Sequence, residues 1–186
     1  MSEILKIRKG LNINLLGKAE RIFVKAKRAE LYAVKPTDFH GLVPKLTVKV
    51  DDKVNAGSPL FFDKYRPDIK FTSPVSGTVQ AINRGERRRI MEVVIDPDET
   101  IQYQDFKASD PSTLGREVII NKLLNSGLWP CIRQRPYNII ANPADAPKSI
   151  FISAFDTAPL GVDYDFMLKD LSKEFQTGID ALMKLT

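Results

Sequence analysis

Residues Thr47–Ile82 read TVKVDDKVNAGSPLFFDKYRPDIKFTSPVSGTVQAI. The stretch contains two similar half-motifs, each with alternating apolar residues and a turn rich in Gly, Ser and Pro. Short apolar runs with a two-residue period, interrupted by Gly and Pro, are typical of strands joined by turns. We therefore expect each half-motif to form a hairpin-like unit and the two units to cover each other's apolar faces.

The composition is that of an ordinary globular chain. Of the 186 residues, 43% are hydrophobic and 27% are charged, which allows one large domain or two small ones and argues against disorder. No apolar run approaches the ~18 residues that a membrane-spanning helix needs, and no signal-peptide pattern follows the basic N-terminus, so we expect a cytoplasmic location. The single cysteine, Cys131, excludes an internal disulfide and a multi-cysteine metal or iron–sulfur site.

Charge is distributed unevenly along the chain. Residues 1–100 carry a net charge of +6 and residues 101–186 a net charge of −1. The basic residues are mostly dispersed, which is typical of a solvated surface. The one dense group is Arg84 with Arg87–Arg89, in a predicted turn between two strands. No aromatic residues alternate with these arginines, so we expect no nucleic-acid partner.

Short apolar runs predict that the first ~100 residues are mostly β-structure. We expect a strand running into a turn within residues 4–13 and further strands at residues 21–25, 31–34 and 90–95.

The period changes after residue 100. Helix-start residues at 109–112, helical spacing and a Gly127 stop predict a helix over residues 112–126. The apolar run at 149–155 resembles a buried parallel strand, and helices are expected over 166–175 and 179–185. The predicted fold class is therefore α+β, with a β domain at 1–100 and the first part of an α/β domain at 101–186. The last helix has an apolar face that needs covering, so we expect the chain to continue.

The half-motifs VKVDDKVNAGSPLF and FTSPVSGTVQAI resemble the biotinyl/lipoyl-type β-barrel, also called the barrel-sandwich hybrid. In carrier members of that fold, a lysine at a hairpin tip is covalently modified. Here we expect a long tip over Asp63–Lys70, without the small or methionine neighbours of a carrier lysine. Lys64 is therefore predicted to be a surface lysine, with a carrier or docking module as an alternative.

A wider resemblance covers the whole chain. It is carried by LKIRKGLNINLLG, KPTDFHGLVPKLTVKVDDKVNAGSPLFFDK, FTSPVSGTVQAINRGERRRIMEVVI and LLNSGLWPCIRQRPYNIIANPADAPKSIFISAFDTAPL, which resemble the A-subunit family of the sodium-translocating NADH:quinone reductases. Such respiratory enzymes pass electrons from NADH through flavins and an iron–sulfur centre on other subunits to ubiquinone, and couple this to sodium export.

The resemblance implies a peripheral subunit on the cytoplasmic side of the bacterial inner membrane. Its partners would be the other subunits of the membrane-bound complex, and ubiquinone is a possible ligand. Family members have no redox cofactor of their own, so this chain would belong to an enzyme without being catalytic by itself. The homologous subunit of the ferredoxin-oxidising electron-transport complex is an alternative.

The second half also resembles the Rossmann-like, flavin-bearing subunits of related NADH-oxidising complexes. Their glycine-rich loop allows backbone amides to approach the flavin phosphate. The corresponding SGLWPCIRQRPYN has Gly127 alone, and Trp129, Pro130 and Ile132 would crowd a phosphate. We therefore expect a filled flavin site, with no cofactor, metal or catalytic residue in this chain.

The same segment contains candidate quinone-binding residues. A quinone needs a flat apolar slot and donors to its carbonyl oxygens, which Trp129, Arg133, Arg135 and Tyr137 offer. The alternative is that Trp129 belongs to the core and that the arginines pair with acids such as Asp156. His40, the only histidine, is a further candidate for a proton role, against an incidental place in a loop.

Overall fold

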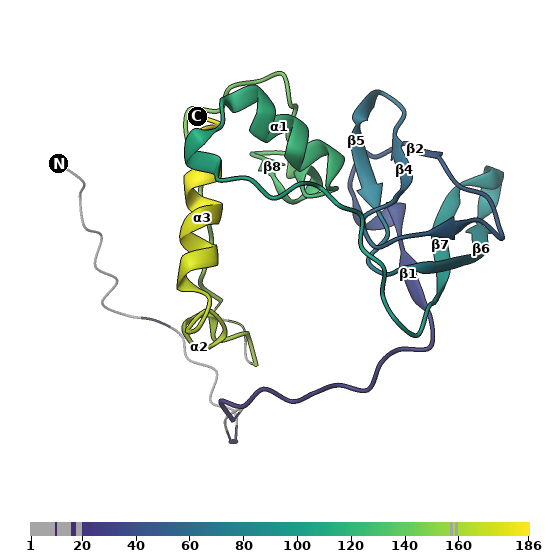
Figure 1. Cartoon of the computed structure of the whole chain (residues 1–186), viewed down its shortest axis with the longest axis horizontal. Helices are drawn as coiled ribbons and strands as arrows, with labels where there is room; N and C mark the ends of the chain where they lie inside the picture. The colour runs from purple at the N-terminus through teal and green to yellow at the C-terminus, as the bar shows by residue number, and fades with distance from the viewer. Residues whose placement is uncertain (1–9, 11–15, 18–19, 157, 159) are drawn as a thin grey trace.

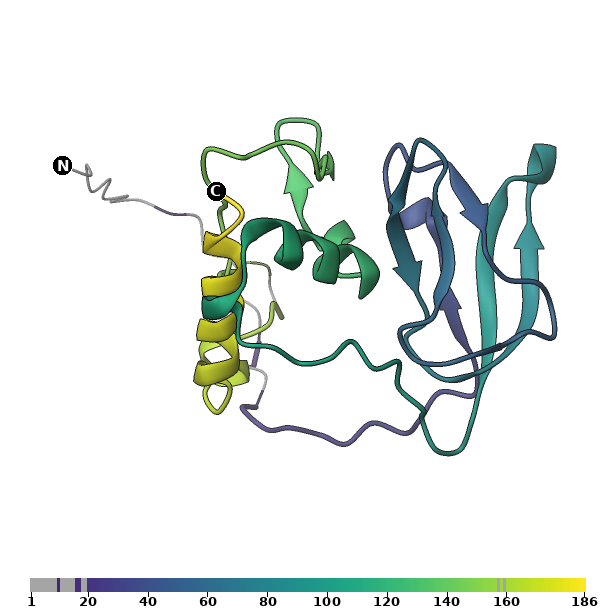
Figure 2. The same ribbon diagram turned by 45° about the horizontal axis from the view of Figure 1, so that its top comes forward.

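The computed structural model describes residues 10, 16–17, 20–156, 158 and 160–186. Apart from Gly10, the strand and turn predicted within residues 4–13 lie outside this set. The described chain forms a β-rich part followed by a helical part, and two extended segments connect them (Figures 1 and 2).

Two antiparallel sheets make up the β-rich part. One has the order β1-β7-β6-β3 and the other β2-β4-β5. The elements of this part are β1 (Tyr32–Val34), η1 (Pro36–Asp38), β2 (Pro44–Leu46), β3 (Lys53–Val54), β4 (Pro59–Asp63), β5 (Arg66–Thr72), β6 (Gly77–Arg84), η2 (Glu86–Arg88) and β7 (Ile90–Pro97).

The two half-motifs are not separate hairpins, and that prediction was wrong. The first half supplies β3 and β4, which lie in different sheets, and the second half supplies β5 and β6, which do the same. Pairing instead joins the halves, because β4 pairs with β5 and β3 pairs with β6. Each half therefore crosses from one sheet to the other. We call the two crossings corners: the first lies between β3 and β4, and the second between β5 and β6.

Glycines occupy both corners. Gly57 and Gly77 have φ angles of +98° and +159°, a backbone conformation that residues with a side chain rarely adopt. At Gly77 an added Cβ would lie 2.0 Å from the carbonyl oxygen of Asp96, on the paired strand β7. The second corner can therefore close only around a residue without a side chain.

Apolar side chains from both sheets form one core. The rings of Phe61 and Phe71 stack with centroids 4.8 Å apart, and Phe39 meets Phe71 edge-on at 4.6 Å. The core extends into the helical part. Its fully or nearly fully buried members include Leu60, Phe61, Ile69, Phe71, Val79, Val93, Ile95, Ile119, Leu124 and Trp129.

The β4–β5 connection is a tight turn at Lys64 and Tyr65, so the predicted long tip over Asp63–Lys70 was wrong. The buried Asp63 carboxylate accepts a hydrogen bond from the Tyr65 backbone N–H at 3.2 Å and pairs with Arg66 at 3.3 Å. These contacts hold the turn, so that β5 begins at Arg66 and residues 66–70 belong to this strand.

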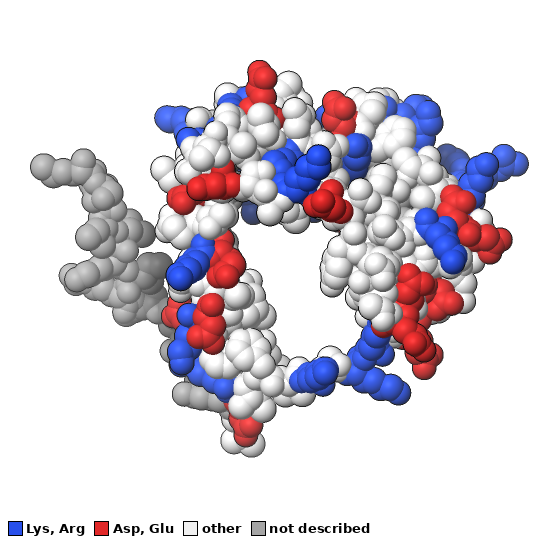
Figure 3. All heavy atoms as spheres, in the orientation of Figure 1, with Lys and Arg blue, Asp and Glu red and all other residues white. Residues whose placement is uncertain are grey.

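Residues 20–30 are exposed and form no strand, so the strand predicted at 21–25 was wrong. This arm instead crosses to the helical part, where Phe23 stacks on Phe166 at 4.7 Å and Arg21 pairs with Asp163 at 2.6 Å. The Phe166 backbone N–H donates to Asp163 and, together with Arg21, lowers the pKa of that carboxyl. An opening remains between the arm and the two parts (Figure 3).

The helical part begins with a shorter helix than predicted. The Asp110 carboxylate accepts from the Ser112 N–H at 2.8 Å, which caps a 3-10 turn and lowers the pKa of Asp110. The chain is extended again at Leu114, so the α-helix starts only at Arg116. The elements are η3 (Pro111–Thr113), α1 (Arg116–Asn125), η4 (Trp129–Cys131), β8 (Arg133–Gln134), β9 (Ile139–Ile140), α2 (Tyr164–Met167) and α3 (Ser172–Met183).

The buried strand predicted at 149–155 is absent from this segment, where Phe151 is 92% exposed. A strand needs a neighbour for its backbone groups, and no described strand pairs with it. The last two predicted helices were also divided wrongly, because α2 ends at Met167 and α3 runs through both Phe175 and Ile179. None of the helices in the described ranges is long and apolar enough to cross a membrane.

Substituting Gly77→Ala tests the corner. The Cβ would strike the Asp96 carbonyl, so we expect a loss of at least about 3 kcal/mol in the free energy of unfolding, measured with urea. Gly178→Ala is the matched control, because it lies inside α3 with nothing within 4 Å and should gain about 0.5–1 kcal/mol. Unchanged stability of the Gly77→Ala variant would contradict the close approach.

Candidate functional site

The β-rich part docks on the helical part through β5. The Lys70 Nζ donates to the Asn125 side chain at 2.6 Å, at the end of α1. Arg66 donates to the Ile140 carbonyl at 3.1 Å while also pairing with the buried Asp63. Hydrogen bonds from the single strand β5 therefore hold both α1 and β9 in place against the β-rich part.

Gly127 lies at the centre of this contact. It follows α1 with a φ of +74°, and an added Cβ would lie 2.4 Å from the Thr72 Oγ1 on β5. The Leu128 N–H bonds back to the Leu123 carbonyl at 3.0 Å, as in a helix C-terminal cap. Gly127 thus ends α1 and allows β5 to pack closely.

Trp129 belongs to the core, as the alternative interpretation predicted. Only 4% of its surface is exposed, and its indole N–H donates to the Ala141 carbonyl at 2.8 Å. Pro130, the next residue of η4 (Trp129–Cys131), is also buried.

The other predicted site residues occupy different surroundings. Arg133 lies on β8 with its guanidinium 5.3 Å from the centre of the Phe39 ring. Arg135 and Tyr137 lie in the exposed turn between β8 and β9, and His40 lies in an exposed turn of the β-rich part. Within the described residues neither arginine forms an ion pair, so the predicted pairing with acids was wrong. The Asp156 carboxylate accepts instead from the Ala158 N–H at 2.8 Å.

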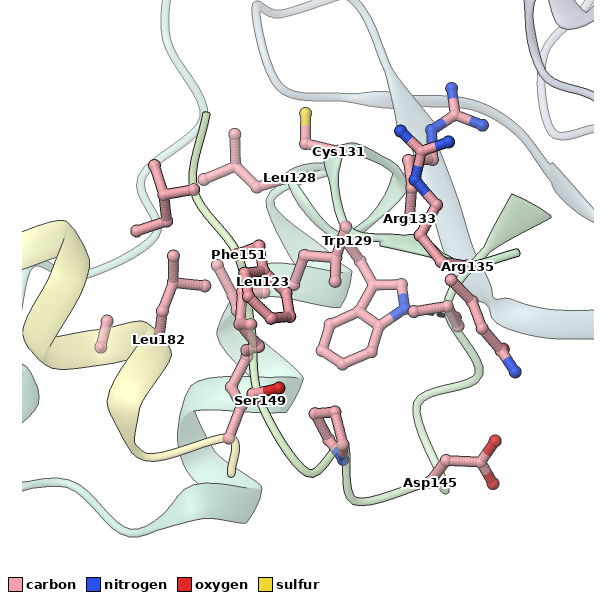
Figure 4. Close-up of a pocket in the computed structure, with 18 of the residues that line it drawn as sticks. Leu123, Leu128, Trp129, Cys131, Arg133, Arg135, Asp145, Ser149, Phe151 and Leu182 are labelled. Carbon is pink, nitrogen blue, oxygen red and sulfur yellow. Dashed lines mark hydrogen bonds between the residues drawn. The ribbon is translucent and has the colours of Figure 1, made fainter. Parts of the chain in front are cut away.

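A groove of about 1610 Å³ runs between η4, the segment 147–155 and α3. Figure 4 shows Leu123, Phe151 and Leu182 on one side of the Trp129 indole and Arg133 and Arg135 on the other. The groove therefore has an apolar wall and a cationic rim. It brings together Trp129, Arg133 and Arg135 of the predicted set, whereas Tyr137 and His40 are not among the residues that line it.

Sequence reasoning missed much of the groove wall. Phe151 was assigned to a buried strand, and the small residues Gly178 and Ala181 on α3 were not considered. The sequence did contain a signal for these residues. The apolar run at 149–155 and the apolar face of the last helix both had to pack against other residues. What lies across from them depends on tertiary structure, which local patterns do not encode.

The chain matches two families. Residues 5–98 match the family described as the NqrA N-terminal barrel-sandwich hybrid domain. This chain belongs to the NqrA family. Residues 114–186 match the NqrA second alpha/beta domain. The matches confirm the predicted α+β class, with a barrel-sandwich hybrid followed by an α/β domain.

Proteins named as the A subunit of the Na(+)-translocating NADH-quinone reductase are similar along almost the whole chain. Identity is 36% over 184 residues with the protein of Pseudomonas aeruginosa (strain UCBPP-PA14) and 38% over 185 residues with that of Saccharophagus degradans. Each alignment covers 98% of this chain and 41% of the relative. The chain thus spans about two fifths of the length of these relatives.

Gly127→Ala tests the docking of the β-rich part. The added Cβ would push against Thr72, so we expect a loss of about 1–3 kcal/mol in stability to urea and faster proteolysis of the connecting segment 98–110. A Thr72→Ala background removes the contacts at 2.4 and 2.8 Å and leaves only the 3.1 Å approach to the Cβ of residue 72 and the backbone strain, so the same substitution should cost less. An equal cost in both backgrounds would contradict the contact.

Proposed function

We propose that this chain acts within the A subunit of a sodium-translocating NADH:quinone reductase. The single observation that carries the proposal is its similarity along 98% of its length to proteins of that name. In this role it is a peripheral subunit on the cytoplasmic side of the membrane, in contact with the other subunits. Electrons pass from NADH through flavins and an iron–sulfur centre on those subunits to ubiquinone, and the enzyme exports sodium.

We also propose that the groove beside Trp129 binds the quinone. The apolar wall of Leu123, Phe151 and Leu182 suits an aromatic ring or an isoprenoid tail. Arg133 and Arg135 at the rim can donate hydrogen bonds to the quinone carbonyl oxygens. Tyr137 and His40, which lie outside the groove lining, are assigned no contact with the ligand.

In this proposal the chain holds the quinone but does not bind a flavin. The loop after α1 supports this. Gly127 packs against Thr72, and the buried Trp129 occupies the adjacent space together with Pro130. Backbone amides in this loop therefore have no open approach to a phosphate. We likewise propose a β domain at 1–100 and an α/β domain at 101–186.

Photo-crosslinking of a quinone analogue to the assembled reductase tests the groove. We expect labelled peptides from residues 128–135 and 149–155, and less labelling when ubiquinone competes. Phe151→Ala should reduce labelling several-fold because it removes part of the apolar wall, whereas the matched variant Tyr137→Ala should leave it unchanged. Labelling confined to other subunits would refute the groove, and labelling that ignores both substitutions would also count against it.

Intact-mass measurement of the purified chain distinguishes the reductase role from a carrier role. We expect the mass calculated from the unmodified sequence, also after expression with biotin and lipoyl ligases. The reason is that the turn bearing Lys64 is held against the helical part through Arg66 and Ile140, whereas a carrier arm must move freely. A mass increase that disappears in Lys64→Arg would establish the carrier.

A further inference from the structure

The β6–β7 hairpin ends in a group of arginines that the proposed quinone site does not use. This arginine tip consists of Arg84 and the three consecutive residues Arg87–Arg89, together with Glu86, and every one of them is exposed. Four guanidinium groups and one carboxylate give the tip a net charge of +3. In the space-filling view, cationic side chains protrude from the edge of the molecule where β6 ends and β7 begins (Figure 3).

The backbone of the tip is strained. Arg87 and Arg88 have φ angles of +53° and +61°, in the left-handed region that residues with side chains rarely adopt. Three hydrogen bonds hold this conformation. The Gly85 N–H donates to the Arg89 carbonyl at 2.8 Å, the Arg89 N–H donates to the Glu86 carbonyl at 3.1 Å, and the Arg84 guanidinium donates to the Arg88 carbonyl at 3.1 Å. Glycine would fit both strained positions better, so folding alone does not account for two arginines there.

The tip has no anionic partner in the described part of the chain. The ion pairs found there join Arg21 to Asp163 and Arg66 to Asp63, and none involves the tip. Glu92, on the neighbouring strand, accepts a hydrogen bond from the Asn83 side chain at 2.8 Å instead. The guanidinium groups are therefore available to an external anion.

We propose that the arginine tip binds the phosphate groups of an anionic membrane surface. Arginine forms paired hydrogen bonds with phosphate and stays charged at all relevant pH values. A stable protein interface would need about 800 Å² on each side around an apolar centre. Met91, beside Gly85, is an exposed apolar residue next to the tip, and at 40% exposure it is too small to form such a centre among the described residues. Adsorption to anionic headgroups requires charge but no apolar centre.

Vesicle co-sedimentation of the chain tests this proposal without any other subunit. The probe is vesicles of equal parts phosphatidylglycerol and phosphatidylethanolamine, with phosphatidylcholine vesicles as the neutral reference. We expect binding to the anionic vesicles that weakens with added salt. The charge reversal R87E/R88E/R89E should lower the partition coefficient at least about tenfold.

Two further variants separate the tip from general charge and from folding. K169E/K173E/K184E reverses three exposed lysines on and near α2 and α3, and should leave most of the binding. R87G/R88G relieves the backbone strain, so it should keep or raise stability while still weakening binding.

Three outcomes would overturn the proposal. The first is that the chain binds neutral vesicles as strongly as anionic ones. The second is that K169E/K173E/K184E loses as much binding as the charge reversal of the tip. The third is that the chain binds no lipid vesicles, although reversing the tip charge detaches it from membranes that contain the reductase. The last outcome would assign the tip to an acidic protein surface. Because the vesicles contain none of the other reductase subunits, failure here would leave the proposed reductase role intact.

Discussion

The close approach of Gly77 to the Asp96 carbonyl is the constraint on which the β-rich part depends. Here the chain leaves one sheet and enters β6, which must lie between β3 and β7. A side chain at this corner would force β7 away and open the sheet. The order of the four-stranded sheet, its buried Val79 and Val93, and the hairpin that carries the arginine tip all follow from that closure.

A second constraint joins the two parts of the molecule. Asp63 is buried, and an isolated buried carboxylate would be costly, so its pairing with Arg66 matters more than an exposed ion pair would. Arg66 also reaches the Ile140 carbonyl, on the strand that pairs with Arg133. The hairpin that would present a modified lysine in a carrier barrel packs here against the helical part through Arg66 and Ile140. That contact argues against a carrier arm, whereas the length of the turn no longer does.

The sequence predicted local features well where local chemistry determines them. The glycine-containing turns, the strands around Phe61 and Val93 and the buried Trp129 all follow from periodicity and residue type. It did not predict which strands pair, because alternation identifies an apolar face but not the sheet to which it belongs. The run at 149–155 shows the same limit, since apolar composition favours burial whereas a strand also needs a neighbour. The contact of Arg133 with Phe39 joins residues far apart in sequence and left no local signal.

Arg133 links the candidate groove to the barrel. Its side chain lines the groove, and its guanidinium lies over the Phe39 ring of the β-rich part. A cation over an aromatic ring contributes only about 0.5–1 kcal/mol at an exposed site, so a ligand carbonyl at the groove rim competes for the guanidinium on similar terms. If the groove binds the quinone as proposed, a ligand that draws Arg133 off the ring weakens the docking of the β-rich part, and the docking weakens the binding of that ligand by the same coupling free energy. The proposed site and the β-rich part would then be coupled through one side chain.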